Sequence, residues 1–303
     1  MSKIKAEAWV LLIVLSLIWG SSFILMKKGL EAYPPMQMAS LRICIAALCM
    51  LPVTIRHLRK VKGRDLFYIF LFGLTNSGVP AFLFAESETV VSSSTAGILN
   101  SLTPIFTFAV GLLFFGVAFN WYGLAGVIIG FAGAFLLVFF GESHAGTAAE
   151  TTNTALYAGL IVIATVLYGF AGNIIKKHLN TVPGHIVSGF AYLFFAIPLI
   201  IWLLFFSDFP SRLVHNPQGI HSLLYIMILA ILGSAMAIVL VVRLIQASSA
   251  LFGSFVTYLI PIVSIMWGLL AGETINFVTL FSLLLIMSGI IIAGLKKQKT
   301  ITN

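Results

Sequence analysis

The sequence predicts an all-α integral membrane protein with ten transmembrane helices, arranged as two inverted five-helix repeats. Three observations predict this fold: the apolar composition, the ten apolar runs and the similarity between the two halves. Of the 303 residues, 60% are apolar and 9% are charged, whereas soluble domains carry roughly 25% charged residues. The mean hydropathy is +1.10. So few charges cannot cover a soluble surface, and we expect lipid to surround most of the chain.

Ten apolar runs are each long enough to cross a bilayer, which takes about 20 residues. The first run follows Lys3 and Lys5, as the core of a signal peptide would, but the nine further runs favour a first span. The expected spans are Ala8–Met26, Met36–Ile55, Leu66–Ala85, Thr95–Phe115, Trp121–Phe140, Ala155–Ile175, Ile186–Phe206, Leu223–Val242, Leu251–Ala271 and Phe277–Leu295.

The connections between the spans are mostly short, and the three longer ones are Arg56–Asp65, Gly141–Thr154 and Ser207–Ser222. Gly141–Thr154 has small and polar residues and no Lys or Arg, which indicates a flexible linker. The sequence therefore predicts a first repeat over residues 1–140, a periplasmic linker over 141–154 and a second repeat over 155–303.

The basic residues predict the orientation of the chain, because cytoplasmic loops carry an excess of Lys and Arg. With ten spans and the N-terminus inside, thirteen of the seventeen Lys and Arg residues fall on the inner side. Both termini are therefore expected in the cytoplasm. The net charge of +8 is explained by these basic loops, and we expect no nucleic-acid partner.

The two halves of the chain repeat each other. A shift of 149 positions lays Trp19-Gly20 on Tyr168-Gly169, and a shift of 157 lays Pro104 on Pro261 and Gly111-Leu112-Leu113 on Gly268-Leu269-Leu270. Because each half has an odd number of spans, the second copy must lie inverted in the membrane. Inverted repeats are typical of secondary transporters, whose binding site lies near the bilayer midplane.

Four stretches carry a resemblance to a known family: Ile18–Phe23, Ser92–Pro104, Gly130–Gly133 and Gly272-Glu273. Through them the chain resembles the drug/metabolite transporter superfamily, specifically its bacterial members with two EamA domains. The resemblance covers about Trp9 to Leu295 and implies a carrier that exports a small metabolite across the bacterial inner membrane. The chain departs from the pattern after the fourth span, where Gly116-Val117 stands in place of a second Gly-Glu.

Polar residues and prolines recur on one face of the fourth and ninth spans. Each proline removes a helical hydrogen bond to the carbonyl four residues earlier, and these carbonyls belong to the polar residues Asn100 and Thr257. Pro80 does the same for Asn76 in the third span. The pattern predicts a substrate cavity, and the alternative is close packing of small residues between helices. The two stripes are Asn100, Pro104, Thr107 and Gly111, and Thr257, Pro261, Ser264 and Gly268.

Two aromatic residues at equivalent positions, Trp19 and Tyr168, lie too deep for an interfacial belt. They either form flat walls of the substrate path or pack in the core. The motif Gly126-x-x-x-Gly130 indicates a close helix–helix contact.

Arg42 is the one charged residue clearly inside an expected span, where ionisable groups are costly and tend to be functional. It could extend outward to the interface, or pair with Glu86 or Glu88 and receive an anionic substrate group. Glu86 and Glu88 fall at the outer end of the third span, and no acid lies deep in a span. The sequence therefore predicts no buried carboxylate for proton or sodium coupling.

Other functional classes find little support. No Walker-type nucleotide motif is present, and the six histidines are scattered without metal-ligand spacing. We therefore expect no metal, no cofactor and no enzymatic activity. The leading hypothesis is a carrier of a small polar, amino-acid-like metabolite that works as a monomer in the lipid bilayer by alternating access. The alternatives are a membrane-embedded transferase of lipid or acyl groups, and a channel.

Overall fold

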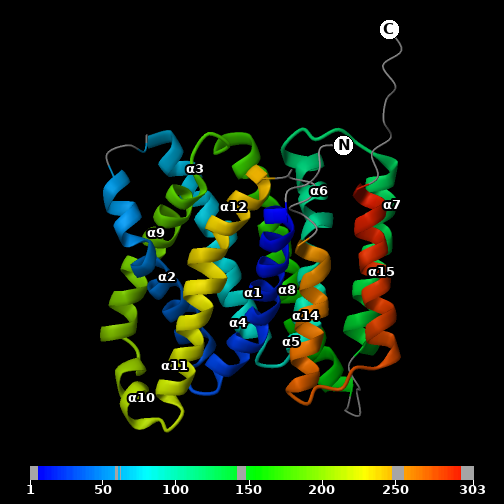
Figure 1. The fold of residues 1–303 in the computed structure, drawn as a ribbon. Coiled ribbons are helices and arrows are strands. Elements are labelled where there is room, and N and C mark those ends of the chain that lie inside the picture. The colour runs from blue at the N-terminus through cyan, green and yellow to red at the C-terminus, as the bar shows by residue number, and fades with distance from the viewer. Residues whose placement is uncertain (1–5, 59–60, 62, 142–147, 248–255, 295–303) are drawn as a thin grey trace.

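The computed structural model describes residues 6–58, 61, 63–141, 148–247 and 256–294. These residues form helices joined by turns, with no strand among them (Figure 1). In chain order the helices, with π-helical segments marked η, are α1 (Ala6–Leu30), α2 (Pro35–His57), α3 (Gly63–Gly73), η1 (Leu74–Gly78), α4 (Val79–Ser87), α5 (Ser93–Asn100), α6 (Thr103–Phe114), α7 (Trp121–Leu136), η2 (Leu137–Gly141), α8 (Ala148–His178), α9 (Gly184–Phe205), α10 (Phe209–His215), α11 (Gly219–Ile228), η3 (Leu229–Met236), α12 (Ala237–Ala247), α14 (Val256–Leu270) and α15 (Phe277–Gly294).

Apolar helices long enough to cross a membrane account for most of the described chain. The outward side chains of several are large and apolar, such as Phe135, Phe205 and Leu284, and such a surface suits lipid. Two shorter apolar helices, Leu259–Leu270 and Phe277–Ile292, accompany the eight long stretches. These eight are Trp9–Leu30, Pro35–His57, Gly63–Ser87, Ser93–Phe114, Trp121–Phe140, Asn153–His178, Gly184–Phe205 and Gly219–Val241.

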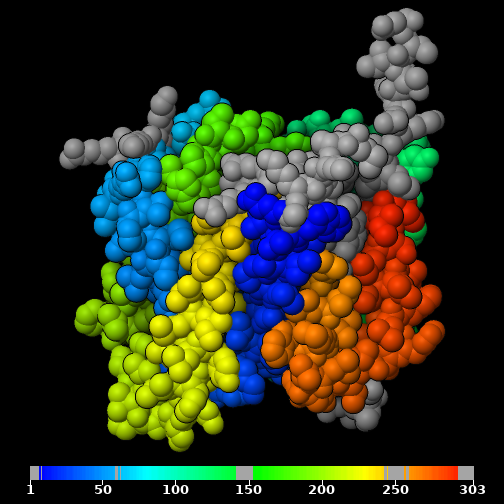
Figure 2. Space-filling model, in the orientation of Figure 1, coloured from blue at the N-terminus to red at the C-terminus, as the bar shows by residue number. Residues whose placement is uncertain are grey.

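The helices form one bundle with two distinct ends. The α1–α2 turn, the α4–α5 connection, α10 and the α14–α15 connection lie together at the lower end in Figure 1, called here the α10 end. The helix pairs with the most extensive contacts are α7 and α15, α2 and α9, α1 and α14, and α6 and α8. On the face shown in Figure 2, α1 lies between α12 and α14.

Three features of the helices differ from the sequence-based expectation. The fourth span is divided into α5 and α6 by a turn at Ser101 and Leu102, because Pro104 starts a new helix. The connection Ser207–Ser222 contains α10, in which Arg212 pairs with Asp208 one turn earlier at 2.6 Å. Helix α8 begins at Ala148, so residues 148–154 of the expected linker are helical.

Several expected segments fall partly on residues that are not described. The residues concerned include 142–147 of the linker, 251–255 of the ninth span and 295 of the tenth span. The helical start of α8 has a simple reason: Ala148, Ala149 and Glu150 are strong helix formers.

Two long helical stretches contain a π-helical segment inside them. η1 interrupts Gly63–Ser87, and η3 interrupts Gly219–Val241. Ser77 of η1 and Ser234 of η3 are separated by the same 157 positions that align the two halves of the sequence. π-helical turns are rare and occur frequently at functional sites, so both segments mark places to look for binding groups.

Glycines allow α7 and α15 to approach each other closely. A Cβ atom at Gly289 would lie 2.6 Å from the carbonyl oxygen of Gly126 and 2.7 Å from the nitrogen of Gly130. These neighbours are backbone atoms, which cannot turn aside as a side chain could. Gly126-x-x-x-Gly130 is therefore a contact surface for α15.

We expect Gly289→Ala to destabilise the protein, because the new methyl group must push the two helix backbones apart. Overpacking of this kind costs about 1–3 kcal/mol. The matched control is Gly159→Ala on α8, where a Cβ would meet no atom within 4 Å and alanine favours the helix by roughly 1 kcal/mol. Thermal unfolding of the purified proteins in detergent should show a lower melting temperature only for Gly289→Ala. Equal melting temperatures for the two variants would contradict the close contact.

Candidate functional site

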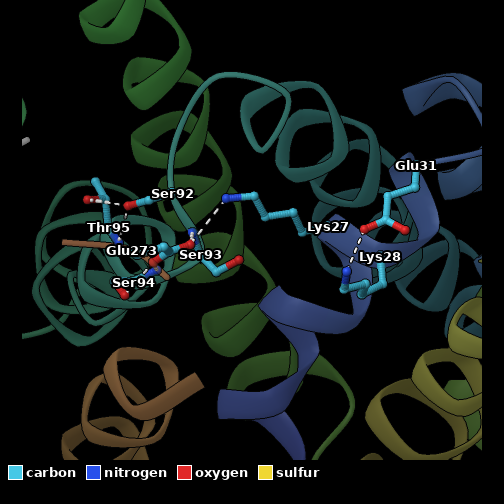
Figure 3. Close-up of polar contacts among 8 residues, drawn as sticks. All are labelled: Lys27, Lys28, Glu31, Ser92, Ser93, Ser94, Thr95 and Glu273. Atoms are coloured by element: carbon cyan, nitrogen blue, oxygen red, sulfur yellow. Dashed lines mark hydrogen bonds and ion pairs between the residues drawn. The ribbon is translucent and has the colours of Figure 1, made fainter. Parts of the chain in front are cut away.

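At the α10 end, the carboxylate of Glu273 lies on the N-terminus of helix α5 (Figure 3). Its Oε1 accepts a hydrogen bond from the backbone N–H of Ser93 at 2.9 Å. Its Oε2 accepts from the N–H and the hydroxyl of Ser94, at 3.1 and 2.6 Å. The first N–H groups of a helix lack partners within it and carry a partial positive charge. Glu273 therefore caps α5 from a segment that is distant in the sequence.

Lys27, near the end of α1, completes this contact. Its Nζ lies 3.2 Å from Oε1 of Glu273, as Figure 3 shows. The Glu273 side chain is 10% exposed and that of Lys27 is 42% exposed, so one partner is shielded while the other reaches solvent. We call Lys27, Glu273, Ser93 and Ser94 the gate cluster, since it joins α1, α5 and the α14–α15 connection.

Charge and hydrogen bonding stabilise the ionised form of Glu273. Burial raises its pKa, but the hydrogen bonds from Ser94 and from the N–H groups of Ser93 and Ser94, together with the charge of Lys27, outweigh burial and hold the pKa below its ordinary value. Glu273 is therefore an anion at neutral pH.

A second carboxylate, Glu88, lies at the same end and has a different environment. Glu88 ends α4, is 3% exposed, and neither of its carboxylate oxygens has a hydrogen-bond partner among the described residues. Burial raises its pKa well above the ordinary value, Lys27 and Arg42 lower it and Glu273 raises it. Glu86, two residues earlier, is exposed. Glu88 is therefore inside the protein and Glu86 is not, so the expectation that no carboxylate is buried is wrong for Glu88.

Two residues singled out in the sequence meet at the π-helical segment η3. Nε of Arg42 donates to the hydroxyl of Ser234 at 3.0 Å, and Nε1 of Trp19 donates to the carbonyl of Gly233 at 3.2 Å. Among the described residues Arg42 forms no ion pair and is partly buried. The positive charge of Arg42 therefore lies within the bundle, and no described carboxylate neutralises it.

Tyr168 belongs to a row of aromatic side chains. Its ring stacks on Phe84 of α4 with 6.0 Å between ring centroids, and Phe84 in turn lies 6.0 Å from Phe23 of α1. The row joins α8, α4 and α1 with flat apolar surfaces. Phe84 lies four residues before Glu88, so the aromatic row continues towards the buried carboxylate.

The helix break between α5 and α6 is satisfied by neighbouring side chains. The carbonyl of Asn100 accepts a hydrogen bond from the Thr103 hydroxyl at 2.7 Å, and the hydroxyl of Thr107 donates to the Thr103 carbonyl at 2.8 Å. The amide of Asn173 on α8 donates to the Thr107 carbonyl at 2.9 Å. The carbonyl freed by Pro104 thus already has a donor.

The other polar residues of the expected stripes lie in or beside this region. Asn76 is in η1 and donates to the Ser77 hydroxyl at 3.1 Å, while Pro261 and Ser264 are buried in α14. The Ser264 hydroxyl donates to the Pro261 carbonyl at 3.0 Å. Thr257 belongs to α14, but its side chain is outside the described part of the structure.

The two stripe glycines, Gly111 and Gly268, lie against neighbouring side chains. A Cβ at Gly111 would lie 2.9 Å from Val117, and a Cβ at Gly268 would overlap Ser94 and Glu273. A Cβ at Gly97 of α5 would overlap the stripe residue Ser264. α5 and α14 therefore meet through small residues, as membrane helices commonly do. This agrees with the packing alternative for the glycines.

The turns that end α6 and α14 have the same backbone conformation, but the residues that follow them differ in chemistry. Gly116 and Gly272 both have positive φ, +74° and +86°, which glycine adopts without strain. The next residues, Val117 and Glu273, lie beside Gly111 and Gly268 respectively. Valine therefore occupies, at the far end of the bundle, the place that the gate carboxylate has at the α10 end.

Several functional candidates were not predicted from the sequence. Lys27, Ser234 and Asn173 gain their partners from segments distant in the chain, and no local pattern reveals them. Glu273 was noticed only as part of a Gly-Glu motif. Metal chemistry has no support in the described residues, which contain no group of three or more His, Cys, Asp or Glu that could hold an ion.

Comparisons with known proteins agree with this architecture. The profile of the EamA-like transporter family matches residues 7–139 and 155–295. The uncharacterized inner membrane transporter YedA of Escherichia coli (strain K12) is 25% identical over 94% of this chain and 90% of its own length. The uncharacterized transporter YoaV of Bacillus subtilis (strain 168) is 26% identical over 92% of this chain and 94% of its own length.

Two further matches concern substrate and fold. A probable terminal-alkyne amino-acid exporter of Streptantibioticus cattleyicolor is 26% identical over 55% of this chain and 54% of its own length. A solved crystal structure superposes with a TM-score of 0.63 and 18% identity, covering 96% of this chain and 97% of the other. This likeness shows the fold alone.

We expect Glu273→Gln to lower stability, because an amide loses the ion pair to Lys27 and the charge-assisted hydrogen bonds at α5. Hydrogen bonds to a charged group contribute roughly 1.5–3 kcal/mol. The matched control is Glu31→Gln, which removes the exposed Lys28–Glu31 pair at 2.6 Å and should cost less than about 1 kcal/mol. Thermal unfolding at pH 7 should separate the two variants.

The pH dependence gives a second check on the same variant. The lowered pKa of Glu273 means that its stabilisation is present above the ordinary value and is lost as the pH falls through the lowered one. The melting temperatures of wild type and Glu273→Gln should therefore converge in acid. A difference that persists unchanged in strong acid would contradict a charge effect.

Proposed function

Because this chain belongs to the EamA-like transporter family, we propose that it is an alternating-access secondary carrier that exports a small polar, amino-acid-like metabolite. We propose ten spans in two inverted repeats, over residues 1–140 and 155–303, in a bacterial inner membrane. The α10 end faces the periplasm and both termini lie in the cytoplasm. A single copy of the chain forms the transport path.

One observation carries this proposal: equivalent positions of the two halves make exchanged contacts. A Cβ at Gly20 of α1 would lie 2.5 Å from Val263 of α14, and a Cβ at Gly169 of α8 would lie 2.9 Å from Phe106 of α6. The shifts of 149 and 157 positions that align the halves relate Gly20 to Gly169 and Phe106 to Val263. Each half thus presses its first helix against the fourth span of the other half. The two halves can tilt relative to each other at such an interface, and alternating access requires a motion of this kind.

The π-helical segments support a binding site between the halves. η1 and η3 occupy equivalent places in the third and eighth spans, and η3 binds both Trp19 and Arg42. Trp19 and Tyr168 would form flat walls, and Asn76, Asn100, Thr107, Thr257 and Ser264 would offer polar groups beside Pro104 and Pro261.

The positive charge of Arg42 supports a substrate that carries an anionic group. Arg42 lies inside the bundle without a carboxylate partner among the described residues, and a guanidinium binds a carboxylate with two parallel hydrogen bonds. A substrate carboxylate would complete this arrangement. The relative named as an amino-acid exporter supports the same substrate class.

The topology follows directly from the proposal. Reporter fusions after Lys62 and after Lys297 should report cytoplasm, and a fusion at Ala148 should report periplasm, because the basic loops stay inside. A periplasmic signal at Lys62 would contradict the number of spans before it.

Transport can be tested with a panel of radiolabelled amino acids on purified protein in liposomes. For an accepted amino acid we expect Asn100→Ala to weaken transport about three- to thirtyfold, since one hydrogen bond in a dry site contributes about 0.5–1.5 kcal/mol and more when a partner is stranded. The matched control is Asn153→Ala, at an exposed position of α8. Equal transport by both variants, with equal melting temperatures, would move the substrate site away from the α5–α6 break.

A further inference from the structure

Glu88 is the only charged residue that is fully buried in the described part of the chain. Both carboxylate oxygens lie out of reach of any described hydrogen-bond donor. The hydroxyls of Ser87 and Ser93, on either side of it in sequence, are also buried without a partner. Buried polar groups without partners are rare in native proteins, and three residues with such groups lie within one short stretch.

The surrounding charges explain why an ionised Glu88 does not fit this conformation. The charges that act on Glu88 are Lys27 of α1, Arg42 of α2 and Glu273 of the α14–α15 connection. Lys27 is paired with Glu273, and Arg42 donates to Ser234. On α8, which packs along α4, the titratable residue Tyr168 lies within the influence of the same Arg42 charge. Neither cation forms a hydrogen bond or an ion pair with Glu88 among the described residues, so an ionised Glu88 would be buried without a partner in this conformation.

Lys27 can serve only one carboxylate at a time. An ionised Glu88 would compete with Glu273 for the ammonium group and draw it away from the N-terminus of α5. A neutral Glu88 removes this competition, and burial of a neutral carboxylic acid costs far less than burial of an unpaired anion.

We propose that Glu88 is a proton-binding site that controls closure of the α10 end, so that the gate cluster forms only when Glu88 carries a proton. This inference rests on the proposed function, in which the α10 end opens and closes towards the periplasm. Each closure then takes up one proton, and each opening can release it.

The proton balance is simple. In the open state the Glu88 carboxylate takes one proton from a hydronium ion of the outer solution, which leaves water and a neutral carboxylic acid. The gate cluster then closes over it, and Lys27 binds Glu273. The reverse sequence returns the proton to water, and no other reactant is required.

Linkage fixes the sign and the size of the pH effect. The closed state binds the proton more tightly than the open state, so raising the pH must favour the open state. Between the ordinary pKa of Glu88 and its raised value in the closed state, one proton per closure changes the ratio of open to closed molecules about tenfold per pH unit. Glu273, whose pKa is lowered, stays ionised over this range.

The experiment measures gate closure without any substrate. Cys44→Ala and Cys49→Ser remove the two native cysteines, and spin labels are attached to Thr89→Cys and Thr274→Cys. Both positions are exposed and flank the gate cluster. Electron paramagnetic resonance then reports the distance between the labels in purified protein in nanodiscs from pH 5 to pH 9.

In the labelled protein with native Glu88, the distance between the two labels should change from short to long as the pH rises. In the labelled Glu88→Gln variant it should stay short at every pH. Glu88→Met, which is also neutral, should behave in the same way if Glu88→Gln folds poorly. The matched control is Glu31→Gln, which removes an exposed carboxylate at the same end and should titrate like wild type. This control also accounts for the exposed His215 and His221, which remain in every variant.

Three outcomes would overturn the proposal. The wild-type distance could be independent of pH, the Glu88→Gln variant could keep the wild-type titration, or closure could follow sodium concentration at fixed pH. Since no substrate is used, a failure of amino-acid transport with an intact, Glu88-dependent titration would reject the proposed substrate class and leave the proton site standing.

Discussion

Hydrocarbon offers no partner to backbone N–H and C=O groups, so every interruption of a helix inside a membrane must be satisfied by the protein itself. The positions of the polar side chains follow from this constraint. Thr103 donates to the carbonyl of Asn100 where α5 ends, and Asn173 of α8 donates to the Thr107 carbonyl of α6. At the start of α5, the N–H groups of Ser93 and Ser94 have no acceptor within the helix and donate to the carboxylate of Glu273. The helix breaks therefore decide which helices must stay in contact, and the two halves of the chain are joined at these breaks.

Much of this architecture could be predicted from the sequence, because the hydropathy of a segment depends only on its own residues and not on its neighbours in space. The long apolar runs gave the spans, and the glycines of Gly126-x-x-x-Gly130 gave a helix contact. The same reasoning could not separate Glu86 from Glu88. Residues two apart on a helix point to nearly opposite sides, and which side is buried depends on how α4 packs on α8.

The gate cluster shows a second limit of sequence reasoning. Its members Lys27 and Glu273 are joined only by the fold, and the cap of α5 comes from the other half of the chain. Sequence rules for helix caps look for a partner within the first turn, where Ser92 does bind the N–H of Thr95 at 3.2 Å. The π-helical segments were missed for a related reason, since one extra residue in a turn leaves no mark in the hydropathy pattern.

The paired turns at Gly116 and Gly272 make the two ends of this transporter different. Both turns have the same left-handed glycine, but one is followed by valine and the other by the glutamate that binds Lys27. An ion pair weakens as salt screens it, whereas a valine contact does not. Ionic strength therefore weakens the Lys27–Glu273 contact after Gly272 and leaves the Val117 contact after Gly116 unaffected. Two turns with the same backbone thus respond differently to salt, because the residue after the glycine is valine in one repeat and glutamate in the other.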